Sequence, residues 1–210
     1  MNAVIYLVAA AAGYLLGSLP FGYLVARWNG VNIFEVGSRN PGATNVKRCV
    51  GKRAGNLVFA LDCLKGIVAT SWVRLLPVSS DAVVWLGLLG FASAMCGHIF
   101  PLFTGFRGGK GVATMFGGTV ALMPVGAIIG AAVWVLFFYS TRYVSVASIC
   151  LALSLPVSAF FLHGTGVLFW FALLVAAFVV FRHRENIIRL FNGTESRFLK
   201  KKAVESGGSH

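Results

Sequence analysis

Four long stretches of this sequence contain no charged side chain, and this feature restricts its possible folds more than any other. They are Met1–Ala26, Ala82–Phe106, Gly111–Thr141 and Tyr143–Phe181. A helix that crosses a bilayer needs ~20 residues of this kind. Apolar types make up 58% of the chain and charged types 11%, against roughly 45–50% and 25% in soluble domains. A soluble fold is therefore excluded, and the sequence predicts an all-α polytopic membrane protein.

The basic residues are concentrated in three polar stretches. The chain has 18 Lys and Arg against 6 Asp and Glu, a formal charge of +12, and the stretches 27–53, 104–111 and 182–202 hold 15 of the 18. Because cytoplasmic loops collect Lys and Arg, all three stretches are predicted on the cytoplasmic side and the N-terminus outside. This rule also accounts for most of the excess charge, so we expect no nucleic-acid partner.

The remaining chain divides into predicted membrane spans. Three are predicted at about Ala3–Ala26, Gly55–Leu75 and Ala82–Phe103. Hydropathy then breaks within Thr114–Val180 at 139–143 and 163–166, and Pro124 marks a further break. An even number of spans must connect the second and third basic stretches if both are cytoplasmic. The total is therefore odd, five or seven, and the residues alone do not choose between them.

The first polar stretch contains Gly37-Ser-Arg-Asn-Pro-Gly-Ala-Thr-Asn-Val-Lys-Arg48. Its glycines and proline favour turns that expose backbone N–H groups. The short hydrogen-bonding side chains are Ser38, Asn40, Thr44 and Asn45, and the cations are Arg39, Lys47 and Arg48. This combination is typical of a phosphate-binding nest. An ordinary hydrophilic loop is the alternative.

The second polar stretch, Arg107-Gly-Gly-Lys-Gly111, precedes an apolar run. A glycine-rich turn at the start of a helix attracts anions through its free N–H groups and the helix dipole. It is not a Walker A loop, because Gly111 stands where that template needs Ser or Thr. An NTPase is therefore disfavoured, and a plain positively charged loop is the alternative.

The third polar stretch is Arg182–Arg197. If it is helical, His183, Asn186 and Leu190 share one face, and Glu185 pairs with Arg189 at i, i+4. The alternative is a basic helix that meets anionic lipid head groups.

Two charged residues, Asp62 and Lys65, fall inside the second predicted span. Charges at that depth are usually partnered, and the i, i+3 spacing lets these two neutralise each other. A structural ion pair and a catalytic role are equally compatible with this pattern. The four cysteines are scattered singly, which predicts free, mostly buried thiols and no zinc site.

Together, the segments GSRNPGATNVKR, GHIFPLFTGFRGGKGVAT and RHRENIIRL-x-NGTESRF, preceded by GSLPFGYLVA, resemble the motifs of one bacterial family. That family is the acyl-phosphate-dependent glycerol-3-phosphate 1-acyltransferases, the PlsY family. The resemblance covers Gly17–Phe198, and Arg39 and Arg107 stand where other members often carry Lys.

The resemblance implies a fold and a location. It implies seven transmembrane helices, some short or broken, with the N-terminus outside and the C-terminus cytoplasmic. Four short helices would then fill Thr114–Val180. The protein would lie in the bacterial inner membrane with its active site facing the cytoplasm. Residues 1–198 would form a single membrane acyltransferase domain, followed by a basic tail, 199–210, whose end resembles a linker running into a tag.

The resemblance also implies a reaction, the first step of bacterial phospholipid synthesis. A fatty acyl group would pass from acyl phosphate to the 1-hydroxyl of glycerol 3-phosphate, giving lysophosphatidic acid and phosphate. An acyl phosphate is a labile mixed anhydride, so a further expected partner is the soluble enzyme that produces it, docked on the cytoplasmic loops.

Matching positions imply roles for individual residues. The phosphoryl group of acyl phosphate would be held by Ser38, Asn40, Gly42, Thr44 and Lys110. Glycerol 3-phosphate would be held by Arg48, Lys110, His183 and Asn186. The substrate-binding set also includes Asn45, the close-approach glycines Gly108, Gly109 and Gly111, and Glu195, which would order the third motif by pairing with a basic neighbour. The expected catalytic residues are Ser38, Lys110, His183 and Asn186.

The chemistry of an acyl phosphate agrees with these residue types. The reaction needs a site for the departing phosphate, stabilisation of a carbonyl oxyanion and alignment of the attacking hydroxyl. The sequence contains no His-x4-Asp pair and no Gly-x-Ser-x-Gly elbow, so covalent serine catalysis is disfavoured. We expect the phosphate of the substrate itself to take the proton. No metal-ligand set is apparent in the sequence, and the reaction needs no cofactor.

Two other classes of protein remain as alternatives. A phosphate-ester transporter more often has internal repeats and polar residues along several spans. A non-enzymatic scaffold would not need Ser, Thr and Asn clustered between glycines. Here the polar residues gather at one predicted face, which favours an enzyme.

Overall fold

The computed structural model describes residues 3–198, and within this range the chain is helical, with no β-strand. The predicted tail, 199–210, lies outside the described residues. The elements are α1 (Ala3–Ser18), α2 (Phe21–Trp28), α3 (Ala43–Cys49), α4 (Lys52–Ser71), η1 (Trp72–Leu75), α5 (Ser80–Ile99), η2 (Leu102–Thr104), α6 (Val112–Leu122), α7 (Pro124–Thr141), α8 (Val144–His163), α9 (Val167–Arg182) and α10 (Arg184–Phe191).

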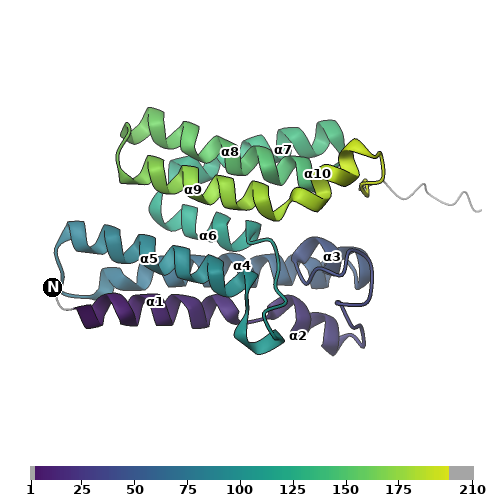
Figure 1. Ribbon diagram of the computed structural model, residues 1–210, viewed down its shortest axis with the longest axis horizontal. Helices are drawn as coiled ribbons and strands as arrows, with labels where there is room; N and C mark the ends of the chain where they lie inside the picture. Colours follow the sequence, from purple (N-terminus) through teal and green to yellow (C-terminus); the bar gives the residue numbers. More distant parts are fainter. Residues whose placement is uncertain (1–2, 199–210) are drawn as a thin grey trace, which may run out of the picture.

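The long helices form two layers with α6 between them (Figure 1). One layer contains α1, α4 and α5, and the other contains α7, α8 and α9. Within the layers α1 packs on α5, and α8 packs on α7 and α9, while α6 packs on α4, α5 and α7. Side chains from α5, α6, α8 and α9 meet in the main apolar core, among them Phe91, Met95, Met115, Leu155 and Val179. The short helix α6 therefore joins the two layers.

The three helix breaks predicted within Thr114–Val180 are confirmed. Pro124 is the first residue of α7, a position where its missing N–H and fixed φ are tolerated. Arg142 ends α7 with a φ of 63°, and Gly164 follows α8 with a φ of 69°. Backbone conformations with a positive φ end helices because they cannot continue the hydrogen-bonded turn. Pro20 likewise separates α1 from α2.

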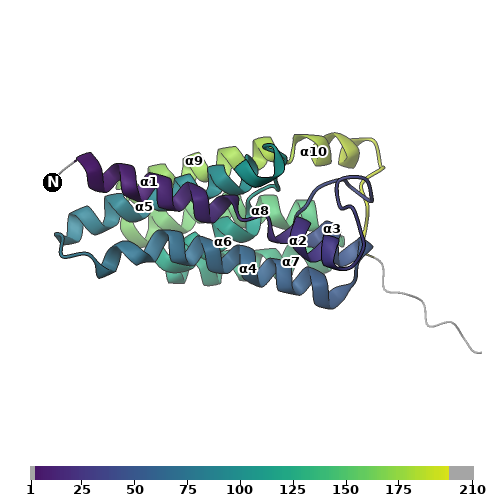
Figure 2. The ribbon, with the colours of Figure 1, turned by 90° about the horizontal axis from the view of Figure 1, so that it is seen from below.

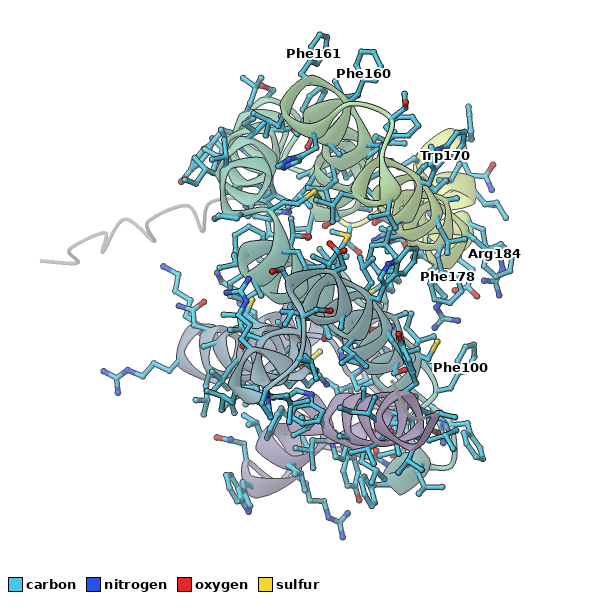
Figure 3. The ribbon with its side chains drawn as sticks, turned by 90° about the vertical axis from the view of Figure 1, so that its left-hand side faces the viewer. Phe100, Phe160, Phe161, Trp170, Phe178 and Arg184 are labelled. Carbon is cyan, nitrogen blue, oxygen red and sulfur yellow. The ribbon has the colours of Figure 1, made fainter. Side chains whose placement is uncertain are left out.

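The helices and their outer surface are those of an integral membrane protein. Within residues 3–198, five spans are long and apolar enough to cross a bilayer, counting α1 with α2. A sixth is added if α9 and α10, which are bent by 55°, form one span. Large aromatic side chains, including Phe160, Phe161 and Trp170, point away from the bundle (Figure 3). Four helices occupy the region where four are predicted, but α6 has 11 residues. Such a helix rises about 16 Å, roughly half the hydrocarbon thickness.

The polar segments gather at one end of the bundle. In Figures 1 and 2 the helices α2, α3 and α10 lie at the end opposite the N-terminus. The loop that connects α8 to α9 lies at the N-terminal end (Figure 1). This arrangement agrees with the even number of spans predicted between the second and third basic stretches.

The four cysteines are free, as predicted, but the expectation that they are mostly buried is wrong. Cys96 is exposed, and Cys49, Cys63 and Cys150 are half-buried. Apolar neighbouring sequence does not predict burial of a cysteine here, because a membrane protein also exposes apolar side chains to lipid on its outer surface.

Glycines allow α4 and α6 to approach closely. A Cβ atom on Gly117 would overlap the carbonyl oxygen of Cys63, whereas one on Gly126 in α7 would meet its nearest neighbour at 3.5 Å, an ordinary contact. We predict that Gly117→Ala lowers the melting temperature of the detergent-solubilised protein by about 5 °C, because overpacking costs ~1–3 kcal/mol. Gly126→Ala is the matched control and should not lower it. Equal melting temperatures for the two variants would contradict this packing.

Candidate active site

The three polar segments meet in one cavity of about 510 Å³ at the polar end of the bundle. Its wall contains residues from the first segment, from the turn before α6 and from the junction of α9 with α10. The predicted site residues in this wall are Ser38, Asn40, Gly42, Thr44, Asn45, Arg48, Lys110, Gly111, His183, Asn186 and Glu195. Segments separated by more than a hundred residues of sequence therefore form one site.

The side chain of Asn45 holds the first segment in its bent conformation. Its Oδ1 accepts the Ser38 N–H at 2.9 Å, and its Nδ2 donates to the Val36 carbonyl oxygen at 3.1 Å. Asn45 is buried, and Gly37 beside it adopts a φ of 58° that favours glycine. Although Asn45 contributes to the cavity wall, its amide is already bonded to the loop, so it shapes the site.

Gly108 and Gly109 depart from their predicted position. Neither lines the large cavity; both pack against the last turn of α5. The Gly109 N–H donates to the His98 carbonyl oxygen at 3.1 Å, and Arg182 donates to the Gly109 carbonyl oxygen at 3.1 Å. The close approach that these glycines permit is therefore to α5. Gly111, with a φ of 84°, lines the cavity and begins α6, as predicted.

Lys110 and Glu195 are joined through Asn186. The ammonium group of Lys110 donates to Asn186 Oδ1, and Asn186 Nδ2 donates to Glu195 Oε1 at 2.7 Å. Ser145 on α8 donates to the same oxygen at 2.7 Å, while Arg189 Nε donates to Glu195 Oε2 at 2.8 Å. The second and third segments are thus locked together by one hydrogen-bonded network.

The predicted partner of Arg189 is wrong, whereas the predicted pairing of Glu195 with a basic neighbour is confirmed. Arg189 pairs with Glu195, and no Glu185–Arg189 bridge occurs among residues 3–198. Burial would raise the pKa of the Glu195 carboxyl, but the hydrogen bonds from Asn186, Ser145 and Arg189 outweigh it and lower that pKa. Glu195 is therefore a carboxylate that anchors the third segment.

His183 and Asn186 share a buried face, as the helical pattern predicts. His183 Nδ1 lies 2.8 Å from the Val179 carbonyl oxygen. Because a carbonyl oxygen only accepts hydrogen bonds, Nδ1 carries the proton, and Nε2 of the neutral ring is an acceptor. His183 can therefore accept a hydrogen bond from a hydroxyl group in the cavity.

The charge balance of the cavity favours anions. Asp62 is paired with Lys65, and Glu195 is paired with Arg189. The other cations in the wall, Arg39, Arg48 and Lys110, have no carboxylate partner within the described range 3–198. An excess of positive charge on a polar wall suits phosphate groups.

Sequence patterns did not identify several residues of the cavity wall. They are Phe59, His98, Trp134, Ser145, Ser148, Arg189 and Ser196. Phe59 and Trp134 belong to helices α4 and α7 and add an apolar wall beside the polar one. Phe59, Trp134, Ser145 and Ser148 lie in apolar sequence that no local pattern marks, whereas His98, Arg189 and Ser196 lie within the quoted motifs but were given no binding role. Asp62 and Lys65 form one of the two alternatives left open by the sequence, an ion pair at 2.8 Å, and Asp62 also lines the cavity.

These features define an integral membrane protein with a cation-rich cavity at one end of its helical bundle. The family model for glycerol-3-phosphate acyltransferases matches residues 7–193. The glycerol-3-phosphate acyltransferase of Geotalea daltonii is 41% identical over 198 residues, covering 94% of this chain and 99% of the relative. That of Aquifex aeolicus is 44% identical over 187 residues, covering 88% and 95%.

Solved structures agree with the sequence relatives. The crystal structure of PlsY (YgiH), an integral membrane glycerol 3-phosphate acyltransferase, in its glycerol 3-phosphate form has a TM-score of 0.85 and 40% identity, covering 92% of this chain and 96% of that one. Its lysophosphatidic acid form has a TM-score of 0.83 and 39% identity, covering 92% and 95%. The chain belongs to the glycerol-3-phosphate acyltransferase family, which confirms the class of membrane acyltransferase that the three motifs predict.

Proposed function

We propose that this protein transfers a fatty acyl group from acyl phosphate to the 1-hydroxyl of glycerol 3-phosphate, releasing lysophosphatidic acid and phosphate. The observation that carries the proposal is the convergence of the three polar segments on one cavity, in which three cations have no carboxylate partner among residues 3–198. Both substrates carry a phosphate group, and its negative charge is stabilised by cations of this kind in the cavity wall. Solved relatives in glycerol 3-phosphate and lysophosphatidic acid forms support the acceptor and the product.

Polar and apolar side chains of the cavity wall would bind the two parts of an acyl phosphate. Ser38, Asn40, Gly42, Thr44 and Lys110 line the polar side and would hold the phosphoryl group. The acyl tail would lie on the apolar side among the helices, against Phe59 and Trp134 and toward the bilayer. Glycerol 3-phosphate would be held by Arg48, Lys110, His183 and Asn186.

This arrangement supports a direct transfer without an acyl-enzyme intermediate. The 1-hydroxyl oxygen attacks the acyl carbonyl carbon and forms the new ester bond, while the bond from that carbon to the phosphate oxygen breaks. Phosphate leaves with the bonding electron pair, and a phosphate oxygen takes the hydroxyl proton, directly or through water. Lys110 stabilises the negative charge that develops on the phosphate and the carbonyl oxygen, and His183 Nε2 orients the acceptor through a hydroxyl group.

The location of the site follows from charge. The segments that form the cavity hold most of the basic residues, and positive-inside logic assigns them to the cytoplasmic side. We propose a seven-helix arrangement in the bacterial inner membrane with the N-terminus outside, the C-terminus cytoplasmic and α6 as a short span. Residues 1–198 would act as one domain. A soluble enzyme that makes acyl phosphate would deliver it at this cytoplasmic end.

The pH dependence of the reaction tests the role of Lys110. Burial lowers the pKa of Lys110 to about 8, with a further contribution from the Arg189 charge. Because the charged ammonium holds phosphate, we predict that kcat/KM falls as pH rises through about 8. Lys110→Arg, whose guanidinium stays charged above pH 12, should move this alkaline limb to higher pH. An unchanged limb in Lys110→Arg would assign the titration to another group.

A donor comparison tests the acyl phosphate assignment. Purified protein would receive labelled glycerol 3-phosphate with palmitoyl phosphate, palmitoyl coenzyme A or palmitoyl-acyl carrier protein. We expect labelled lysophosphatidic acid with palmitoyl phosphate alone. Product formed from either thioester at a comparable rate would overturn the assignment of the donor.

A further inference from the structure

Three ionisable side chains form a buried cluster beneath the cavity. Asp62 and Lys65 lie on α4 and His98 lies near the end of α5. Asp62 Oδ1 is 2.8 Å from Lys65 Nζ and 3.5 Å from His98 Nδ1. All three side chains are less than a tenth exposed. Ionisable groups inside membrane helices are unfavourable unless they are partnered, and they often serve a function.

Lys65 connects this cluster to the first polar segment. Its Nζ donates to the Leu19 carbonyl oxygen at 3.1 Å, at the break between α1 and α2, and lies 5.7 Å from the centre of the Phe21 ring. The helix α2 that follows packs tightly on the first segment, because a Cβ on Gly22 would overlap the Pro41 carbonyl oxygen. The cluster therefore supports the backbone that carries Ser38 and Asn40.

His98 connects the same cluster to the second polar segment. Its carbonyl oxygen accepts the Gly109 N–H at 3.1 Å. Its imidazole lies against Gly109, since a Cβ at that position would overlap Nε2. Lys110 is the next residue. Both Asp62 and His98 also line the substrate cavity, so the cluster lies directly under the groups that hold the two phosphates.

We propose that Asp62 and His98 are positioning residues for the acyl transfer, an inference that rests on the proposed function. The Asp62 carboxylate, whose Oδ1 lies 3.5 Å from His98 Nδ1, holds the imidazole against Gly109. The imidazole in turn sets the position of Lys110 relative to the phosphate-binding side chains of the first segment. Lys65 balances the charge of Asp62. The pair acts through Lys110, because Nε2 faces Gly109.

Two double variants test this role at equal net charge. Asp62→Asn with Lys65→Met keeps an acceptor oxygen for His98, whereas Asp62→Leu with Lys65→Met removes it. Neither leaves a buried charge unpaired, which would itself destabilise the fold. We expect the Leu variant to have a kcat about 10²-fold below that of the Asn variant, as a misplacement of about 1 Å does. The KM for glycerol 3-phosphate should differ between the two variants by less than kcat does, since of its four expected partners only Lys110 is displaced and Arg48, His183 and Asn186 are unchanged.

Hydrogen exchange gives a second readout that does not depend on activity. Backbone amides in 104–112 should exchange faster in the Leu variant than in the Asn variant, while those of α8 should exchange alike in both. The proposal would be overturned if the Asn and Leu variants had equal kcat values and equal exchange in 104–112. An equal loss of kcat in both variants, relative to wild type, would also overturn it. If the wild-type protein makes no lysophosphatidic acid, the proposed function fails, and the exchange comparison still decides whether Asp62 positions this segment.

Discussion

Lys110→Met should reduce kcat/KM by about 10³-fold, the loss expected when a charged donor to the transition state is removed. The side chain of methionine has a similar length, so the cavity keeps its shape while the charge and the bond to Asn186 Oδ1 disappear. Both substrates are expected to contact this ammonium, so its loss weakens binding of each phosphate and stabilisation of the leaving group together. The measurement is the initial rate of phosphate release at pH 7.

Lys52→Met is the matched control for this experiment. Lys52 is exposed at the start of α4 and lies outside the cavity wall. The same substitution there should leave the rate within about twofold of wild type, because isolated surface charges contribute little. A Lys110→Met rate within about tenfold of wild type would contradict the role given to Lys110, since loss of such a donor costs more.

Glu195→Gln should lower kcat/KM by about 10²-fold and also lower the melting temperature, because a network of hydrogen bonds is left partly unsatisfied. Glu195 accepts from Asn186, Ser145 and Arg189. A glutamine offers one acceptor oxygen and a donor in place of the second. The NH2 group of the glutamine must then face a donor, either Arg189 or the Asn186–Ser145 pair. The resulting shift of the network moves Asn186 and displaces the Lys110 ammonium that it holds.

Glu185→Gln is the control for this second prediction. Glu185 is exposed in the first turn of α10, on the same helix as Asn186 and Arg189. Its substitution should leave both rate and melting temperature unchanged. A Glu195→Gln variant that melts lower yet keeps the wild-type kcat/KM would assign Glu195 a structural role without control over Lys110.

Local sequence signals predicted most of the fold. Pro124 was predicted as a helix break and is the first residue of α7, whereas the break at Pro20, inside the predicted span Ala3–Ala26, was not predicted. The distribution of basic residues predicted that three segments lie at one end of the bundle, since membrane topology allows only alternating crossings. Hydropathy did not predict that α6 is only 11 residues long, because apolarity alone gives no helix length.

The contacts that complete the site were less accessible to sequence analysis. His98 and Asp62 are 36 positions apart on different helices, and only the packing of α4 against α5 brings them together. Arg189 pairs with Glu195 and not with the expected Glu185, because the chain turns back after α10 and brings Glu195 close to Arg189. Gly108 and Gly109 were predicted to let the backbone approach the substrate. Glycine spacing indicates that another group lies close to the backbone, but it does not identify that group, which here is the end of α5.

The central claim is tested most directly by measuring phosphate release and lysophosphatidic acid formation together. Detergent-purified protein would receive palmitoyl phosphate and glycerol 3-phosphate, singly and in combination. We predict that phosphate appears only when both substrates are present, in equal amount to lysophosphatidic acid, and that both products disappear in Lys110→Met. No product from the mixture, with uptake of glycerol 3-phosphate into proteoliposomes that contain the protein, would contradict the account and assign the cavity to transport.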